Sequence, residues 1–167
     1  LTELPNRRYL IERVEAAIAE AARRGESIAL LLIDLDHFKP INDGHGHDAG
    51  DLLLRTLGQR LRGLVRSSDM AARLGGDEFA ILLTGATVEQ DAGQVAERLL
   101  HELSLPVPYQ GTSLAVTVSV GAAFFPHHAE EFSRLYKAAD EALYRAKQQG
   151  RASWVQQDGR APADQPM

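Results

Sequence analysis

The sequence predicts a single α/β (α+β) domain on the split β-α-β plan, with a mixed central sheet of about five strands and surrounding helices. One unbroken apolar run, several segments of helical periodicity and a double glycine between two short apolar runs lead to this prediction. In chain order they give helix, strand, helix, hairpin, helix, strand, helix. Without its first helix this is β-α-β-β-α-β plus an added helix, an order that predicts helices on one side of the sheet.

The first expected helix begins after Pro5 with Asn6 as its N-cap and ends at Gly25. Apolar residues recur at helical spacing between these points, at Leu10, Val14, Ala17, Ile18 and Ala21. The next segment, 27–35 (SIALLLIDL), is too short for a good helix and is apolar throughout. We therefore expect a strand that is buried on both faces, followed by a loop.

A second amphipathic helix is expected from Asp48, with an inner face formed by Leu53, Leu54, Leu57, Leu61, Leu64 and Val65. Two strands are expected at 70–74 and 78–83. Gly75 and Gly76 separate them, and because a tight hairpin turn needs positive φ, they predict a hairpin at this point.

The second half of the chain contains two more amphipathic helices and one strand. The third helix has its inner face at Ala92, Val95, Ala96, Leu99 and Leu103, and the fourth has its inner face at Phe132, Leu135, Tyr136, Ala139, Leu143 and Ala146. Between them, 114–125 predicts a strand interrupted by Gly121. From Val155 the chain is polar, with two prolines and a glycine. We expect one domain over 1–155 and a frayed tail over 156–167.

Composition excludes several function classes. The formal net charge of -5 argues against binding a nucleic acid polymer through a cationic surface, although a local cluster can still bind small phosphorylated ligands. The chain has no cysteine, which excludes disulfides, thiolate chemistry and Cys-bound zinc. Without a bilayer-spanning apolar run or a signal peptide, we expect a cytoplasmic domain with no membrane contact of its own. Because the sequence starts at Leu1 rather than Met, we expect it to belong to a longer protein.

Three acids are the most informative local feature. Asp34 ends an apolar strand, where an ionised carboxylate is costly unless it is paired or bound to a metal; the alternative is an acid that accepts backbone hydrogen bonds. Asp77 and Glu78 follow the double glycine. If the hairpin lies beside the first strand, Asp34 faces Asp77. With the Leu35 carbonyl nearby, these oxygens favour Mg²⁺ or Mn²⁺ over zinc and indicate phosphoryl or nucleotidyl transfer.

Cations that could hold a triphosphate are also present. Lys39 lies in the expected loop after the first strand, and Lys147 and Arg151 flank the end of the last helix. The alternative for Lys147 and Arg151 is a favourable interaction with the helix macrodipole. Backbone N–H groups around Phe38 and Lys39 could also bind phosphate.

The segment 73–83 (RLGGDEFAILL) resembles the signature of the GGDEF diguanylate cyclases, with Gly75, Gly76, Asp77, Glu78 and Phe79 in the five signature positions. The segments LTELPNRRYL, LLIDLDHFKPINDGHGHDAGD, TVSVGAAFFP and ADEALYRAKQQGR resemble the same family in its own order, so the resemblance covers residues 1–151. It implies a ferredoxin-like fold of the nucleotidyl-cyclase palm type. The departures are Glu3, His37, Pro40 and Ala152, none of which is an implied ligand.

The resemblance also implies roles for individual residues. Asp34, the Leu35 carbonyl and Asp77 would bind two Mg²⁺ or Mn²⁺ ions, with Glu78 supporting them and Asp77 as candidate base. Lys39 would stabilise phosphate charge beside Phe38. The remaining implied substrate contacts are Asn42, His47, Asp51, Gly75, Gly76, Lys147 and Arg151.

Guanine recognition is implied for Asn42 and Asp51, with His47 as another substrate contact. An ionised carboxylate is a natural acceptor for the N1–H and N2–H₂ edge of guanine, and adenine has no equivalent donor pair. The alternatives are that Asp51 caps a helix, that Asn42 is a turn residue and that His47 is structural.

A second site is implied by Arg66 and Asp69, which match the RxxD product-inhibition motif of the family, with Arg98 as a further contact. The planar guanidinium of Arg66 could bind guanine and phosphate, and Asp69 could accept from guanine. The alternative is a pair of ordinary surface charges, because R-x-x-D is a common pattern.

The implied reaction converts two GTP into cyclic di-GMP and two pyrophosphates across a two-fold homodimer, within a larger bacterial signalling protein that can be membrane-anchored. Cyclic di-GMP would be both product and inhibitor. Three alternatives stay open: a catalytically silent module that senses GTP or cyclic di-GMP, a partner domain in a tandem cyclase/phosphodiesterase protein, and an ATP-using or mixed-product cyclase, which Asp51 disfavours.

Overall fold

The structure, a computed structural model, describes residues 2–85 and 87–157. The helices are α1 (Arg7–Arg24), α2 (Phe38–His45), α3 (His47–Leu64), α4 (Val88–Leu103) and α5 (Phe132–Gln148). The strands are β1 (Ser27–Asp36), β2 (Met70–Gly75), β3 (Glu78–Gly85), β4 (Val107–Tyr109), β5 (Thr112–Leu114), β6 (Thr117–Phe125) and β7 (Trp154–Gln156). None of the helices in this part of the chain is long and apolar enough to cross a bilayer.

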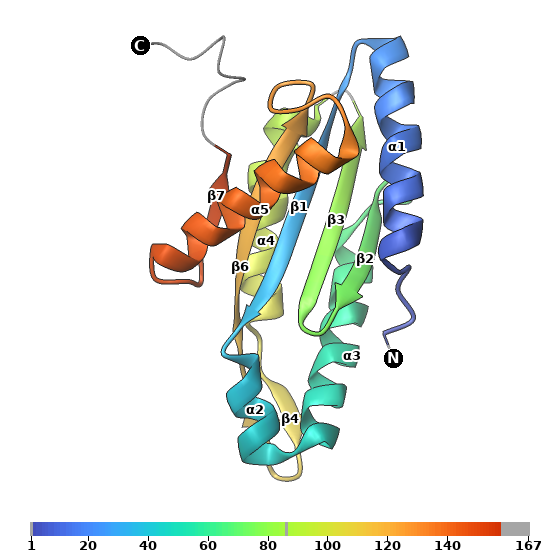
Figure 1. Cartoon of the computed structure of the whole chain (residues 1–167). Helices are drawn as coiled ribbons and strands as arrows, with labels where there is room; N and C mark the ends of the chain where they lie inside the picture. Colours follow the sequence, from blue (N-terminus) through green and yellow to red (C-terminus); the bar gives the residue numbers. More distant parts are fainter. Residues whose placement is uncertain (1, 86, 158–167) are drawn as a thin grey trace.

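The central sheet has five strands in the order β2-β3-β1-β6-β7 (Figure 1). Its pairs are antiparallel except β6 with β7, which is parallel, so the predicted mixed sheet is confirmed. β1 lies in the middle and is buried from Ile28 to Asp36, as its unbroken apolar run predicts. The acids that end β1 therefore lie at the centre of one sheet edge, between β3 and β6.

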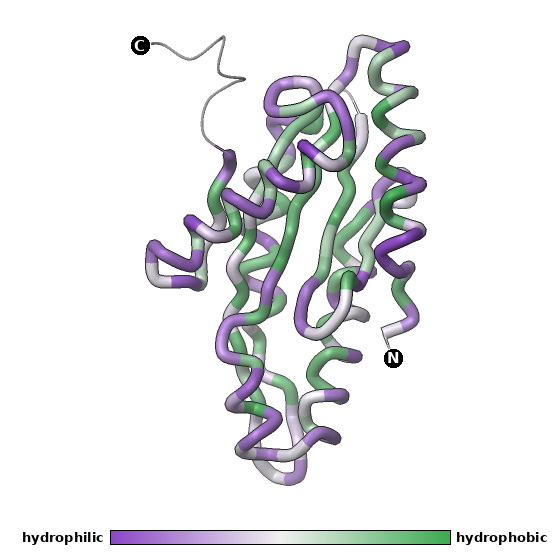
Figure 2. Tube along the Cα trace, in the orientation of Figure 1, coloured by the Kyte–Doolittle hydropathy of each residue, from purple (hydrophilic) through white to green (hydrophobic). Residues whose placement is uncertain are grey.

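Helices cover both faces of this sheet, and the expectation of one covered side is wrong. Figure 1 shows α1 and α5 on one face and α3 and α4 on the other, and Figure 2 shows the hydrophobic strands between them. In β1, Leu31 and Ile33 pack into the core with α3 and α4, whereas Leu30 and Leu32 pack with α1 and α5. A strand that is apolar at every position has two apolar faces, and each needs its own helical layer.

The first helix has the predicted ends. The Asn6 side chain accepts a hydrogen bond from the Tyr9 N–H at 3.0 Å, and Gly25 terminates the helix at a φ of 66°. Just before the cap, the Pro5 carbonyl accepts from the Arg73 N–H at 3.0 Å. The entering chain is thereby hydrogen-bonded to β2, two residues before the double glycine.

Gly121 does not interrupt its strand, contrary to the expectation from sequence. β6 runs unbroken from Thr117 to Phe125, and Gly121 is needed because α5 crosses it closely. A Cβ at this position would lie 2.2 Å from the Leu143 nitrogen and 2.3 Å from the Ala139 carbonyl oxygen. Leu114, the first residue of the predicted strand, instead belongs to β5, which pairs with β4 in a separate hairpin, and residues 115–116 link β5 to β6.

The chain does not fray at residue 155 or 156. Trp154–Gln156 forms β7 beside β6, and the Gln157 N–H donates to the Ala122 carbonyl at 2.8 Å. The Trp154 indole N–H donates to Glu97 of α4 at 2.9 Å, which joins β7 to the helical layer. The rest of the expected tail, 158–167, lies outside the described residues.

Candidate active site

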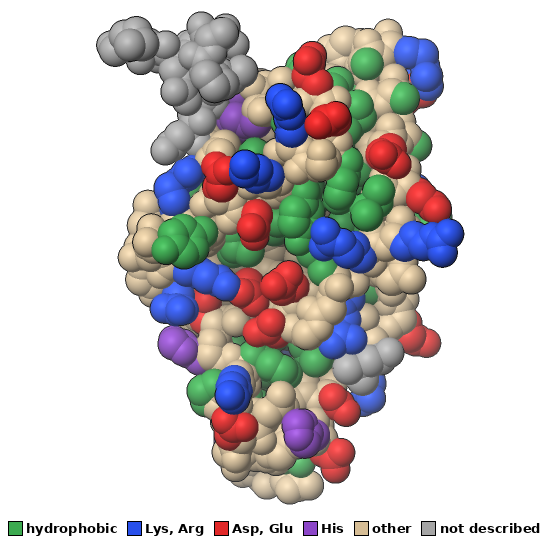
Figure 3. All heavy atoms as spheres, viewed as in Figure 1, with side chains coloured by type: hydrophobic (Ala, Val, Ile, Leu, Met, Phe, Trp, Pro, Cys, Tyr) green, Lys and Arg blue, Asp and Glu red, His purple; other side chains and the backbone are tan. Residues whose placement is uncertain are grey.

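The β2–β3 hairpin lies beside the end of β1, as predicted. Asp34 is paired in register with Glu78, and the Leu35 N–H donates to the Asp77 carbonyl at 3.2 Å. Gly76 and Asp77 form the turn between the paired residues Gly75 and Glu78, and both glycines have positive φ. Figure 3 shows acidic side chains gathered on the middle of this face with basic side chains around them. The fold thus brings together acids that are more than forty positions apart in the sequence.

Burial and neighbouring carboxylates raise the pKa values of two of these acids, Asp77 and Glu78. Burial raises the pKa of Asp77 above its ordinary value, and the negative charges of Asp34 and Glu78 raise it further. Burial and the charges of Asp34 and Asp140 raise the pKa of Glu78, while Lys147 and Arg7 act in the opposite direction. Burial and the closeness of the three carboxylates thus both disfavour ionisation of Asp77 and Glu78.

Asp34 is the most buried of the three acids, at 8% exposed. The Lys147 ammonium contacts Oδ2, whereas Oδ1 is buried and has no hydrogen-bond partner among the described residues. A buried carboxylate oxygen without a donor is a position that a cation would stabilise.

A divalent ion fits the donor set only with help from the backbone. No group of three or more His, Asp or Glu side chains that could hold a metal occurs within residues 2–85 and 87–157. Asp34 and Asp77 supply two carboxylates, and the Leu35 carbonyl at the same strand end would be a third oxygen donor. Hard oxygen donors with uncompensated charge suit Mg²⁺ or Mn²⁺.

A fourth acid, Asp36, is a structural residue that the sequence analysis missed. It is 3% exposed and accepts hydrogen bonds from Thr117 Oγ1 at 2.6 Å, Ser119 Oγ at 2.8 Å and the Ala152 N–H at 3.0 Å. Arg151 Nε lies 3.9 Å from Asp36 Oδ1. Asp36 thus fixes the segment after α5, and the two predicted triphosphate cations, Lys147 and Arg151, lie against the acids that end β1.

The expected loop after β1 is a helix. α2 spans Phe38–His45, with Pro40 in its first turn, where a missing N–H costs little. His37 enters it at a φ of 58°. Phe38 packs against the core, whereas Lys39 is exposed, with its N–H in the first turn where phosphate could bind.

α2 lies very close to α3, which begins at His47, one residue before the expected start at Asp48. A Cβ on Gly50 would lie 1.8 Å from Asn42 Oδ1 and 3.2 Å from Phe38 Cζ, so Gly50 makes room for the Asn42 amide. The Asn42 side chain thus lies against Gly50, the residue before Asp51 in α3. His47 and Asp51 are both exposed, and no contact joins His47 to Asn42 or Asp51 among the described interactions.

Comparison with known proteins decides the family. The family model described as "Diguanylate cyclase, GGDEF domain" matches residues 1–153. The chain belongs to the GGDEF family. It is 41% identical to the diguanylate cyclase TpbB of Pseudomonas aeruginosa over 154 residues. This alignment covers 92% of this chain and 35% of TpbB. The chain thus spans about a third of the length of that relative.

Solved structures of GGDEF domains share the fold. The GGDEF domain of PA1120 (YfiN or TpbB) from P. aeruginosa superposes with a TM-score of 0.91 at 40% identity, covering 95% of this chain and 99% of that one. The GGDEF domain of DgcB from Caulobacter crescentus, in complex with c-di-GMP, gives 0.83 at 32% identity, covering 95% and 91%. These matches confirm the predicted palm-type cyclase fold.

The close approach of α2 and α3 in this GGDEF domain gives a testable prediction. Gly50→Ala should displace the Asn42 amide, and if Asn42 binds guanine as the family resemblance implies, affinity for a non-hydrolysable GTP analogue should fall by about tenfold. Calorimetry would measure the affinity. Gly63→Ala, also in α3 but with nothing within 4 Å of the added Cβ, is the matched control. Equal affinities of the two variants would contradict a role for Asn42 in binding.

The RxxD segment of the GGDEF domain lies on a turn before β2. Asp69 is not a surface charge: it is 8% exposed, accepts from the Thr84 N–H at 3.1 Å and pairs with Arg66 Nε at 3.2 Å. The hydrogen bond and charge of Asp69 raise the pKa of Arg66. A pocket of about 220 Å³ is lined by Leu64, Arg66, Asp69, Leu83, Asp91, Gln94, Val95 and Arg98. All three residues of the predicted product site therefore line one pocket.

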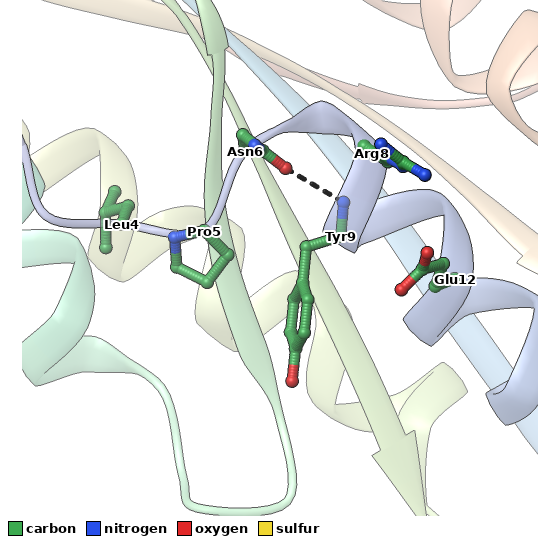
Figure 4. Close-up of a pocket in the computed structure, with 6 residues that line it drawn as sticks. All are labelled: Leu4, Pro5, Asn6, Arg8, Tyr9 and Glu12. Atoms are coloured by element: carbon green, nitrogen blue, oxygen red, sulfur yellow. Dashed lines mark hydrogen bonds between the residues drawn. The ribbon is translucent and has the colours of Figure 1, made fainter.

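Another pocket lies where the chain enters α1 (Figure 4). It is lined by Leu4, Pro5, Asn6, Arg8, Tyr9 and Glu12, and the hydrogen bond that caps α1 lies within it. It contains none of the residues predicted to bind substrate or product.

Proposed function

We propose that this GGDEF domain is a diguanylate cyclase that condenses two GTP into cyclic di-GMP and two pyrophosphates. The observation that carries the proposal is the intact signature, Gly75 to Phe79, whose two acids lie beside Asp34 at the end of β1. The relative TpbB, at 41% identity, is named a diguanylate cyclase, which supports the proposal.

Asp77 is the proposed base. In each of two successive transfers, the 3′-oxygen of one GTP bonds to the α-phosphorus of the other, the bond to pyrophosphate breaks, and Asp77 accepts the hydroxyl proton. A raised carboxyl pKa makes Asp77 a better proton acceptor. Asp34, Asp77 and the Leu35 carbonyl would hold Mg²⁺ or Mn²⁺, two per site, with Glu78 beside them. When bound, such ions lower the hydroxyl pKa and neutralise phosphate charge.

The remaining site residues hold the nucleotide in this proposal. Lys39 and the N-terminal turn of α2 that follows His37 bind the phosphates beside Phe38, and Lys147 and Arg151 bind them from the end of α5. Asn42 and Asp51 bind guanine, with His47 at the rim of the site. Asn42 has the strongest structural support, because Gly50 leaves room for its amide.

The product needs two domains. Each holds one GTP, so a face-to-face homodimer with two-fold symmetry brings the two nucleotides together. The specific activity of the isolated domain should therefore rise with protein concentration.

The test is direct. The protein is mixed with GTP and Mg²⁺, and cyclic di-GMP and pyrophosphate are measured in equal-time samples over a range of protein concentrations. Formation of about two pyrophosphates per cyclic di-GMP supports the proposal. Tight GTP binding with no pyrophosphate release contradicts it and identifies a sensing module instead.

Product inhibition is part of the proposal, and it gives a second prediction. Cyclic di-GMP would bind the pocket that Arg66, Asp69 and Arg98 line. The half-inhibitory concentration of cyclic di-GMP, measured for each protein relative to its own uninhibited rate, should be about tenfold or more higher for Arg66→Ala than for the unchanged protein. The reason is the loss of a charged hydrogen-bond donor. Arg55→Ala, an exposed arginine of α3 outside this pocket, is the control. Unchanged inhibition of Arg66→Ala would refute the assignment.

A further inference from the structure

Lys147 and Asp34 form an ion pair at the centre of the candidate site. Lys147 belongs to the last turn of α5, and its ammonium contacts Asp34 Oδ2 at the end of β1. The Asp34 side chain is 11% exposed and the Lys147 side chain 32% exposed. Lys147 therefore supplies the positive charge that compensates a nearly buried carboxylate.

The backbone of Lys147 is fixed. The Lys147 carbonyl accepts from the Gly150 N–H at 3.3 Å, and the preceding carbonyl, of Ala146, accepts from the Arg151 N–H at 3.1 Å. Along the same helix, the close contact at Gly121 leaves α5 no room to move toward the sheet. The flexible side chain of Lys147 has more freedom than this backbone, and its 32% exposure gives it room to change position.

The contact with Asp34 conflicts with both roles proposed for these residues. An ammonium on Oδ2 occupies a lone pair that a divalent cation would need, and the donor and the charge that it gives to Asp34 are not available to a triphosphate. Both conflicts end together if Lys147 leaves Asp34.

We propose that Lys147 is an exchangeable counter-ion, which neutralises Asp34 in the empty site and moves to the GTP phosphates when a divalent cation takes its place. This inference rests on the proposed metal-dependent function. It makes the binding of cation and nucleotide cooperative, because each favours the position of Lys147 that the other requires. By thermodynamic linkage, the cation raises the affinity for the nucleotide by the same factor as the nucleotide raises the affinity for the cation.

The exchange predicts two opposite effects of one substitution. Lys147→Met keeps the apolar stem and removes the charge, so the nucleotide-free protein should bind Mn²⁺ about tenfold more tightly than the unchanged protein. Its affinity for a non-hydrolysable GTP analogue in saturating Mn²⁺ should fall by about tenfold. Lys137→Met, the same change at an exposed position of α5, should alter neither affinity. Electron paramagnetic resonance of free Mn²⁺ and calorimetry would supply the two affinities.

A high-salt measurement separates direct pairing from a general loss of positive charge. At about 1 M KCl the Debye length is about 3 Å, so the tighter Mn²⁺ binding should persist if Lys147 competes by contact. Lys147→Gln is a second variant in case Lys147→Met does not fold, and it should also bind Mn²⁺ more tightly.

Two results would overturn the inference. If the unchanged protein binds Mn²⁺ and neither variant of Lys147 binds it more tightly, the exchange is refuted while the proposed metal site stands. If neither the unchanged protein nor the variants bind Mn²⁺, the metal site and the exchange are refuted together.

Discussion

Asp77→Asn is expected to lower the rate of cyclic di-GMP formation by about 10³-fold or more, because it removes both the proposed base and a carboxylate of the cation site. The measurement is the initial rate of product formation at saturating GTP and Mg²⁺. Asp140→Asn is the matched control, since Asp140 is an exposed acid that acts on Glu78 through its charge and is not a proposed ligand. A rate of Asp77→Asn within tenfold of the unchanged protein would contradict the role of Asp77.

The same substitution should stabilise the metal-free protein at neutral pH. Folding raises the pKa of Asp77. The protonated Asp77 therefore contributes fully to the free energy of unfolding below the ordinary carboxyl pKa, and this contribution is lost as the pH rises through the folded-state pKa. Asparagine removes the repulsion with Asp34. In EDTA the Tm should rise by about 1–3 °C at about pH 7, and this gain should disappear near pH 4. A Tm decrease at neutral pH would show that Asp77 does not carry uncompensated charge.

Gly121→Val should cause the largest loss of stability. The added carbons would overlap backbone atoms of α5, at Leu143 and Ala139, and these cannot rotate away as a side chain can. We expect a loss of about 3 kcal/mol or more in the free energy of unfolding, measured by urea titration with circular dichroism. Loss of folded protein on expression would be the extreme form of the same result.

Gly93→Ala is the control for that experiment. Its Cβ would meet the Trp154 ring at 3.5 Å, an ordinary contact, and alanine favours a helix. Its free energy of unfolding should stay within about 1 kcal/mol of the unchanged protein. If Gly121→Val is as stable as Gly93→Ala, α5 does not lie on β6 as described.

Much of the fold could be predicted because local pattern and long-range structure agree. The apolar run that ends at Asp34 required a central strand, and the double glycine required a hairpin with its acids at the turn. The pairing of that hairpin with β1 followed from the split β-α-β order. The same order could not show that α1 and α5 share one face, because no local pattern records which face a helix covers.

What the sequence did not predict depends on contacts between distant residues. The segment of α2 was expected to be a loop, and Pro40 and Gly44 do weaken its helical pattern. The packing of Phe38 against the core compensates for their low helix propensity. β7 is only three residues long, too short for any periodicity. The roles of Asp36 and Asp69 depend on hydroxyl and N–H groups that the fold brings to them, so their burial was not visible in the sequence.

Trp154 gives the domain a built-in optical reporter. It is the only tryptophan of the chain, and it lies in β7 with its indole bonded to Glu97 of α4. Any detachment of the last strand would expose this ring to water and shift its fluorescence. Emission at this single site therefore reports the closing of the sheet edge separately from unfolding of the rest of the domain, which circular dichroism follows.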